Sequence, residues 1–238
     1  MNFTKFLKTT SLEKHQINDL RFFYEYLNGE HNSKVSSKIV ALIGEAGIGK
    51  TYLAKRFAIN LNIPVFYVGQ ENIPYKNVKK YSTLNDLNEA KIPDNCLVYL
   101  DDLTYLLEET EYGEVSVDCK RLLFKLFAKV QALPRAGILF TTNYLEFDTQ
   151  FIDRLDIVIE MEAPNKLSKK KFLTSQYNDF LDKNKINNIT SNSTGFNFRD
   201  LNEVVKRSFR YGKGKFTEVS IKSALDTYSP TNFRNYDV

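Results

Sequence analysis

Short apolar runs alternate with helical patterns along the first two thirds of the chain. The runs lie at 39–43, 63–68, 96–100, 138–143 and 157–161. They are rich in β-branched residues and lack a regular apolar–polar alternation, as is typical of strands buried on both faces of a parallel sheet. Between them, apolar residues recur at the spacing of helices. The pattern therefore predicts an α/β fold in which a five-stranded parallel sheet is sandwiched by helices.

The pattern changes on either side of this region. A helix is predicted at 12–27, with its end signal at Gly29. After Pro164 only helical patterns remain, at 169–183, 199–209 and 217–228. The Asn- and Ser-rich stretch 184–195 favours a loop, with a brief helical turn as the alternative. We therefore expect an α/β domain that includes the N-terminal helix, a small all-helical domain and a tail, at 1–163, 164–229 and 230–238.

Two charged stretches lie outside the five predicted strands. Residues 69–82 are polar and basic, with lysines at 76, 79 and 80 between two tyrosines. Residues 108–118 are acidic, which is typical of a solvated loop. The net charge of +4 permits a nucleic-acid partner without favouring one. A solvated surface remains the alternative for these lysines and for those at 169–171.

The composition is that of an ordinary folded protein. The chain has 238 residues, of which 42% are hydrophobic and 26% charged, enough to bury a core. No apolar run approaches the roughly 20 residues that span a bilayer, and no signal-peptide pattern is visible. Cys96 and Cys119 form no ligand or redox motif, which indicates buried thiols in a reducing compartment. We therefore expect a soluble, cytoplasmic protein without a membrane partner.

Residues 44–51 fit the phosphate-binding pattern G-x-x-x-x-G-K-[ST]. A strand is predicted before them and a helix from about Lys50, so a chance Gly-rich turn is the weaker alternative. Glycines let backbone N–H groups turn toward a phosphate, and the helix N-terminus adds positive charge. Lys50 is expected to reach the outer phosphates of ATP and Thr51 to ligate Mg²⁺. The predicted cofactor-binding residues are Gly44, Glu45, Ala46, Gly47, Ile48, Gly49, Lys50, Thr51 and Tyr52.

Two acidic residues, Asp101 and Asp102, follow the apolar run at 96–100. In open α/β sheets, ligands bind beyond the carboxyl ends of the strands. We expect Asp101 to hold Mg²⁺ with Thr51, and Asp102 to polarise an attacking water. The alternative is that the two acids cap the next helix.

The order of the motifs resembles that of the AAA+ ATPase family over nearly the whole chain. A phosphate loop, an acidic strand end, Asn143 after the fourth strand, an arginine at 154 and C-terminal helices follow one another. The resemblance implies that Asn143 orients the attacking water and that Arg154 reaches into the site of a neighbouring subunit. It also implies that the helical domain is a lid whose Arg199, within 195–201, contacts the γ-phosphate.

Each of these three residues has a structural alternative. Asn143 can cap the next turn. The two arginines can pair with nearby acids: Arg154 with Asp153 or Asp156, and Arg199 with Asp200. Arg135 is a weaker candidate for the trans-acting role.

Two departures from the family pattern affect the expected function. The family usually has Asp-Glu where this chain has Asp101-Asp102, so we expect slow hydrolysis, unless the local backbone re-aims the shorter carboxylate. Protein-threading members carry an aromatic–hydrophobic–glycine loop after the second strand. The corresponding stretch 73–81 has aromatic residues but not the glycine pattern.

The resemblance implies an ATP hydrolase that works as a homo-oligomer, as a hexameric ring or a spiral. Its first expected function is to remodel a protein substrate or adaptor. A nucleic-acid-associated loader and a slow nucleotide-gated assembly switch are the alternatives.

Overall fold

The computed structural model describes residues 7, 10, 12–30, 38–107, 116–144 and 149–230. Its contacts divide the chain into two compact units. The first consists mainly of Leu12–Gly44 and Lys50–Met161, and the second mainly of Glu45–Gly49 and Glu162–Val238. Most of the predicted acidic loop, at 108–115, and most of the predicted tail, at 231–238, lie outside the described residues.

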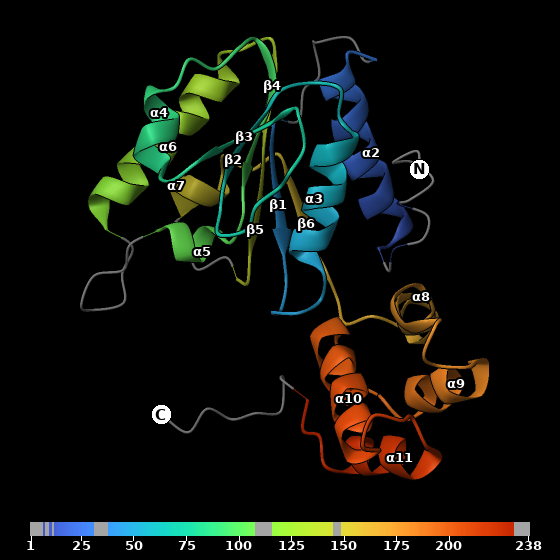
Figure 1. Ribbon diagram of the computed structural model, residues 1–238. Coiled ribbons are helices and arrows are strands. Elements are labelled where there is room, and N and C mark those ends of the chain that lie inside the picture. The colour runs from blue at the N-terminus through green and yellow to red at the C-terminus, as the bar shows by residue number, and fades with distance from the viewer. Residues whose placement is uncertain are drawn as a thin grey trace. The chain divides into compact units, whose positions relative to one another are not determined.

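The first unit contains a six-stranded sheet in the order β3-β2-β4-β5-β1-β6, and all of its pairings are parallel (Figure 1). Its strands are β1 (Ile39–Ile43), β2 (Val65–Val68), β3 (Val78–Tyr81), β4 (Asn95–Leu100), β5 (Arg135–Thr142) and β6 (Ile157–Glu160). Strands β1, β2 and β4 are buried along almost their whole length. The predicted parallel α/β fold is therefore confirmed.

The predicted number of five strands is wrong, because the basic stretch 69–82 contains the edge strand β3. This strand has four residues and pairs only with β2. Lys79 and Lys80 are exposed, whereas Val78 and Tyr81 are half-buried. An edge strand of this kind lacks the continuous apolar run that identified the other five strands, and its lysines are the type of side chain that protects a sheet edge from further pairing.

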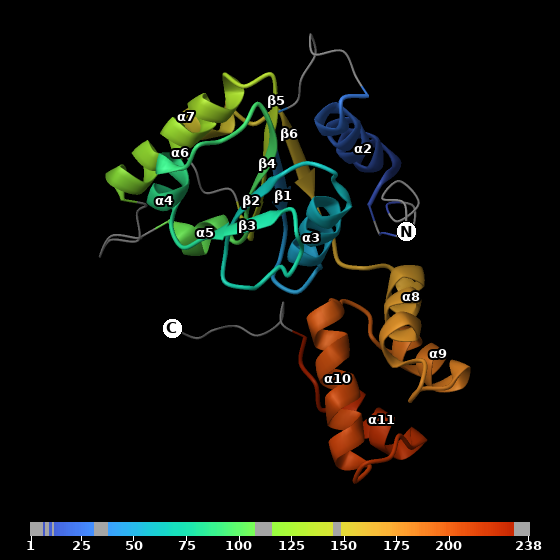
Figure 2. The ribbon, with the colours of Figure 1, turned by 45° about the horizontal axis from the view of Figure 1, so that its top comes forward.

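Helices cover both faces of the sheet (Figures 1 and 2). They are α2 (Lys14–Asn28), α3 (Lys50–Asn60), α4 (Leu84–Glu89), α5 (Leu103–Leu106), α6 (Val117–Gln131) and α7 (Thr149–Ile152). On one face, Phe23 of α2 stacks on Phe57 of α3 with ring centroids 5.3 Å apart. On the other face, Phe127 of α6 and Phe151 of α7 pack in the core that contains Phe140 of β5. Helices α3 and α7 therefore lie on opposite faces.

The predicted N-terminal helix is present as α2, and its end follows from local chemistry. Gly29 adopts the left-handed conformation, with φ 80°, and its N–H group donates to the carbonyl oxygens of Glu25 and Tyr26. Such a cap satisfies carbonyl groups that the last helical turn leaves without partners.

From Lys166 onward, the described part of the second unit is mainly helical. It contains α8 (Lys166–Tyr177), α9 (Lys183–Ser191), α10 (Phe198–Tyr211) and α11 (Glu218–Asp226). The prediction of a mainly non-helical stretch at 184–195 is therefore wrong, since α9 is longer than a brief turn and occupies most of it. Asparagine is a weak helix former, but Ile186 and Ile189 of α9 are buried in the core of this unit, and this packing overrides the propensity.

Among the described helices, none is both long and apolar enough to cross a membrane.

Gly137 of β5 provides a test of the packing between the sheet and α2. A Cβ atom at this position would lie 2.5 Å from Cε2 and 2.7 Å from Cζ of Phe23. The Phe23 ring is stacked on Phe57 and has little room to move. We expect Gly137→Ala to lower the free energy of unfolding by about 1–3 kcal/mol, as overpacking does, measured by chemical denaturation.

The matched control for this prediction is Phe23→Leu, which makes room for the new methyl group. The double variant should lose less stability than the sum of the two single variants, because the residues are in contact. Strict additivity would mean that the Phe23 ring is not the obstacle.

Candidate functional site

The backbone of the predicted phosphate loop requires glycine at specific positions. Gly47 and Gly49 have φ values of 89° and 100°, and Gly44 has 143°. Residues with a side chain rarely adopt such angles, so the loop conformation depends on these glycines. Helix α3 begins at Lys50, directly after the loop. The first N–H groups of this helix are therefore available to an anion.

Lys50 and Asn143 come together at the carboxyl ends of β1 and β5. These strands are neighbours, and their register places Ile43 beside Thr142. The Lys50 side chain is 8% exposed, and its Nζ donates to the Gly44 carbonyl oxygen at 2.6 Å and to Asn143 Oδ1 at 2.9 Å. Sheet pairing thus brings the loop lysine to the predicted sensor, 93 residues away in sequence.

Asp101 lies at the carboxyl end of β4 and is 6% exposed. One of its oxygens, Oδ1, accepts three hydrogen bonds from hydroxyl groups. The donors are Thr51 at 2.8 Å, Tyr99 at 2.8 Å and Thr141 at 2.9 Å. The predicted metal-binding pair, Thr51 and Asp101, is therefore in direct contact. A buried carboxylate needs such donors, because burial removes its hydration.

Asp102 has a different environment from its neighbour. It adopts the left-handed conformation, with φ 58° and ψ 71°, which aspartate tolerates better than most residues. Its N–H group donates to Thr141 Oγ1 at 2.8 Å, and its side chain is exposed and does not cap α5. The alternative role of a helix cap is therefore not realised by Asp102, and its carboxylate is open to solvent.

Sequence reasoning missed two of the three hydroxyl donors to Asp101. Thr141 is one of the polar residues that end the apolar run of β5. Its position at the carboxyl end of a strand could have indicated that it lies near the site. Tyr99 lies within the buried strand β4. Nothing in the sequence distinguishes it from a tyrosine that only packs in the core.

The two candidates for a trans-acting arginine lie in different places. Arg154 is exposed and follows α7, so it belongs to the opposite face of the sheet from α3. Its guanidinium lies 4.6 Å from the ring centroid of Phe124, and it forms no ion pair within the described residues. Asp156 instead accepts hydrogen bonds from the backbone N–H groups of Lys38 and Ile39. Arg135 begins β5, at the amino end of the strand.

Arg199 is an exposed residue in the first turn of α10, in the second unit. Its neighbour Asp200 is buried and accepts hydrogen bonds from Asn197 and Tyr228, and Arg199 makes no ion pair in the part of the chain that the structure describes. Within the same unit, Asn197 Nδ2 donates to the carbonyl oxygen of the loop residue Ala46 at 3.0 Å. The start of α10 is thus tied to the middle of the loop.

The remaining loop residues differ in exposure. Ile48 is buried, whereas Tyr52 is 53% exposed and has Arg56 5.3 Å from the centroid of its ring. Tyr52 is therefore a surface residue next to the loop.

The residues of the first unit fit a nucleotide with Mg²⁺. Two of the required parts, the lysine and the Thr51–Asp101 pair, are formed at one edge of the sheet. The described residues contain no cluster of three or more His, Cys, Asp or Glu side chains for a metal. Mg²⁺ beside a nucleotide is usually held by one or two protein oxygens together with phosphates and water, so such a cluster is not required for it.

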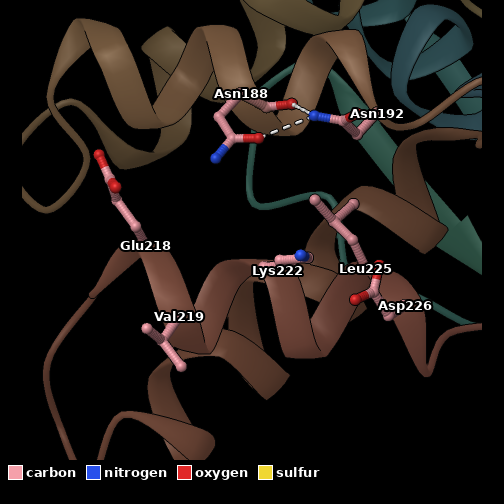
Figure 3. Close-up of a pocket in the computed structure, with 7 residues that line it drawn as sticks. All are labelled: Asn188, Asn192, Glu218, Val219, Lys222, Leu225 and Asp226. Atoms are coloured by element: carbon pink, nitrogen blue, oxygen red, sulfur yellow. Dashed lines mark hydrogen bonds between the residues drawn. The ribbon is translucent and has the colours of Figure 1, made fainter.

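A separate hollow of about 510 Å³ lies between α9 and α11 of the second unit (Figure 3). Its lining includes Glu218, Lys222 and Asp226. Asn192 Nδ2 donates to the Asn188 side chain at 2.8 Å, so this polar pair is already satisfied. The lining combines opposite charges without an unpaired buried group, and we assign no function to it.

The parallel sheet, the glycine loop before α3 and the Thr51–Asp101 pair define a P-loop nucleotide-binding protein. The model of the ATPase family associated with various cellular activities (AAA) matches residues 40–163, which is more than half of the chain. The chain therefore belongs to the AAA family.

Solved structures support the same fold. A chain of the E. coli MS115-1 HORMA:CdnC:Trip13 complex is similar with a TM-score of 0.62 and 15% identity, covering 92% of this chain and 88% of that one. The FIGL-1 AAA domain, crystallised with ADP, is similar with a TM-score of 0.65 and 13% identity, covering 92% and 82%. No curated protein sequence matches the chain. At these identities the likeness shows the fold alone.

The conformation of Asp102 generates a prediction about its charge and its length. Asp102→Asn keeps a residue that tolerates the left-handed region, and we expect it to lower ATP turnover about 100-fold, as loss of a general base does. Asp102→Glu should also lower turnover, because the longer side chain is less suited to this backbone conformation. Both variants are compared with wild type by steady-state ATP hydrolysis.

Asp94→Asn is the matched control for this pair. Asp94 is an exposed acid that precedes the amino end of the same strand, so its loss should leave turnover unchanged. Normal turnover in Asp102→Asn would remove Asp102 from the chemistry, and faster turnover in Asp102→Glu would mean that the aspartate is too short rather than re-aimed.

Proposed function

We propose that this chain binds ATP with Mg²⁺, hydrolyses it slowly in a homo-oligomer, and uses the cycle to remodel a protein partner. The observation that carries the proposal is the meeting of Lys50 with Asn143 and of Thr51 with Asp101 at one edge of the sheet. Phosphoryl transfer to water depends mainly on positioning and on stabilising charge, and these side chains are the types that the reaction uses.

The residues of the first unit would divide the work as follows. Lys50 holds the outer phosphates, and Thr51 and Asp101 hold Mg²⁺. The metal ion would neutralise negative charge on the phosphate oxygens. Asn143 orients the attacking water, and the exposed carboxylate of Asp102 accepts its proton. The hydrogen bond between Lys50 and Asn143 keeps the lysine and the sensor in reach of one another.

Two exposed arginines would supply the remaining positive charge. Arg199, at the start of α10, would act from the helical unit as a lid residue. Arg154 lies on the other face of the sheet from α3, so it is badly placed for its own site and is proposed to serve a neighbour. A site completed by a second subunit explains why a ring or spiral would be needed for turnover.

One of the similar solved structures favours a protein partner, because that structure is a complex that also contains HORMA and CdnC. The described segment 69–81, where threading members carry their pore loop, forms a short crossover and the edge strand β3 instead. We therefore propose remodelling through movement of the two units rather than threading through a pore.

A nucleic-acid partner is the second candidate, favoured by the basic edge of the sheet. Lys79 and Lys80 are exposed on β3, and exposed lysines can contact the phosphates of a nucleic acid. The lysines at 169–171 support it less than expected, because Lys169 is buried and donates to the Ser193 carbonyl oxygen. Burial also lowers the pKa of Lys169.

ATP turnover measured with an unfolded protein, single-stranded DNA and duplex DNA tests the proposal. We expect measurable turnover in the wild type and a higher rate when the unfolded protein is added. The Lys50→Ala variant should show no turnover, because it should no longer bind ATP tightly. Stimulation by DNA alone would favour the second candidate. ATP-dependent assembly with no turnover under any condition would instead support a nucleotide-gated switch.

The trans-acting role of Arg154 gives a further prediction. Arg154→Ala should bind ATP normally but hydrolyse it about 10³-fold more slowly, at the low end of the effect of arginine fingers. Mixing it with Lys50→Ala should restore part of the activity, because each variant supplies what the other lacks at a shared interface. The measurement is turnover against mixing ratio and protein concentration.

Arg135→Ala is the control, since Arg135 lies at the amino end of β5 and should leave turnover unchanged. Full activity in Arg154→Ala, or a rate per subunit that stays constant on dilution, would contradict the role in trans.

A further inference from the structure

Two buried tyrosines lie side by side beneath Asp101. Tyr67 of β2 and Tyr99 of β4 are paired in the sheet register, and both are fully buried. Their ring centroids are 5.1 Å apart. Residues two positions apart on a strand lie on the same face, so Tyr99 and Asp101 point the same way.

The two hydroxyl groups differ in their partners. Tyr99 donates to Asp101 Oδ1 at 2.8 Å. The Tyr67 hydroxyl is buried and has no hydrogen-bond partner among the described residues. It lies against Gly69, where a Cβ atom would be only 2.3 Å away from it. Gly69 therefore leaves the space that the Tyr67 hydroxyl occupies. Both hydroxyl groups lie near Asp101, but among the described residues only the Tyr99 hydroxyl forms a hydrogen bond of normal distance and angle with the carboxylate.

We propose that Tyr99 is a positioning residue for the metal site, fixing Asp101 through Oδ1 so that Oδ2 faces the water shell of Mg²⁺. The inference rests on the proposed function and deepens it. Of the three donors to Oδ1, Thr51 is itself the proposed ligand of the ion, and Thr141 also accepts from the Asp102 N–H group. Tyr99 is the donor without a second hydrogen bond in the described structure.

The chemistry of a buried phenol suits this task. A phenol hydroxyl donates one hydrogen bond, and the Tyr99 hydroxyl directs its bond to Asp101 Oδ1 at 2.8 Å inside the core. Groups that hold metal ligands in place affect metal affinity even though they do not touch the metal.

Tyr99→Phe and Tyr67→Phe form a matched pair that tests the proposal. Both variants keep the ring and remove one buried hydroxyl from neighbouring strands. We expect Tyr99→Phe to weaken Mn²⁺ binding to the ADP-loaded protein about 10-fold, the low end for such groups because Asp101 would meet the ion through water. Tyr67→Phe should leave the Mn²⁺ affinity unchanged. Free Mn²⁺ is measured by electron paramagnetic resonance, and ADP affinity without metal should be equal in all three proteins.

The outcomes separate the assignment from the function on which it rests. If Tyr99→Phe and wild type bind Mn²⁺ equally well, the positioning role of Tyr99 is wrong, but the proposed function stands. This holds even if Tyr99→Phe has a lower unfolding temperature. An equal loss in both variants also overturns the positioning role, because pocket polarity rather than the Tyr99 hydrogen bond would then be responsible. A wild-type protein that binds neither ADP nor Mn²⁺ overturns the proposed function together with this inference.

Discussion

The buried carboxylate of Asp101 is the constraint on which the rest of the site depends. A carboxylate that loses its water must find donors, and hydrogen bonds to a charged group contribute about 1.5–3 kcal/mol each. Here the donors come from α3, β4 and β5, through Thr51, Tyr99 and Thr141. One side chain thus fastens the helix after the phosphate loop to the centre of the sheet. Moving any of the three elements would leave a buried charge with fewer partners.

Sheet order explains why the proposed site residues gather at one edge of the sheet. Strands β4, β5 and β1 are consecutive in the sheet, so the residues after them, Asp101, Asn143 and Gly44, lie in a row. The sequence predicted that these residues follow strand ends, because each of the three strands is an apolar run that ends in a polar residue or glycine. It did not predict the order of the strands in the sheet. The phosphate motif then predicted that a nucleotide binds at the carboxyl ends of these strands.

The features that sequence did not predict are those decided by packing and backbone geometry. Strand β3 is too short and too exposed for a periodic signal, and α9 forms from weak helix formers because Ile186 and Ile189 are buried. The contrast between Tyr67 and Tyr99 could not be predicted either. Both tyrosines lie in apolar runs of the sequence. Only the positions of their hydroxyl groups relative to Asp101 distinguish them.

The two consecutive aspartates illustrate how one residue type can take two roles. Asp101 continues the strand, is buried and accepts three hydrogen bonds on one oxygen, so its orientation is fixed. Asp102 adopts the left-handed backbone conformation, and its side chain is exposed to solvent. The missing methylene relative to glutamate is therefore not the only difference from the usual Asp-Glu pair, because the backbone direction at this position also sets where the carboxylate points. A fixed acid beside an exposed one suits the roles proposed for them, because metal binding needs fixed geometry and proton acceptance needs access to water.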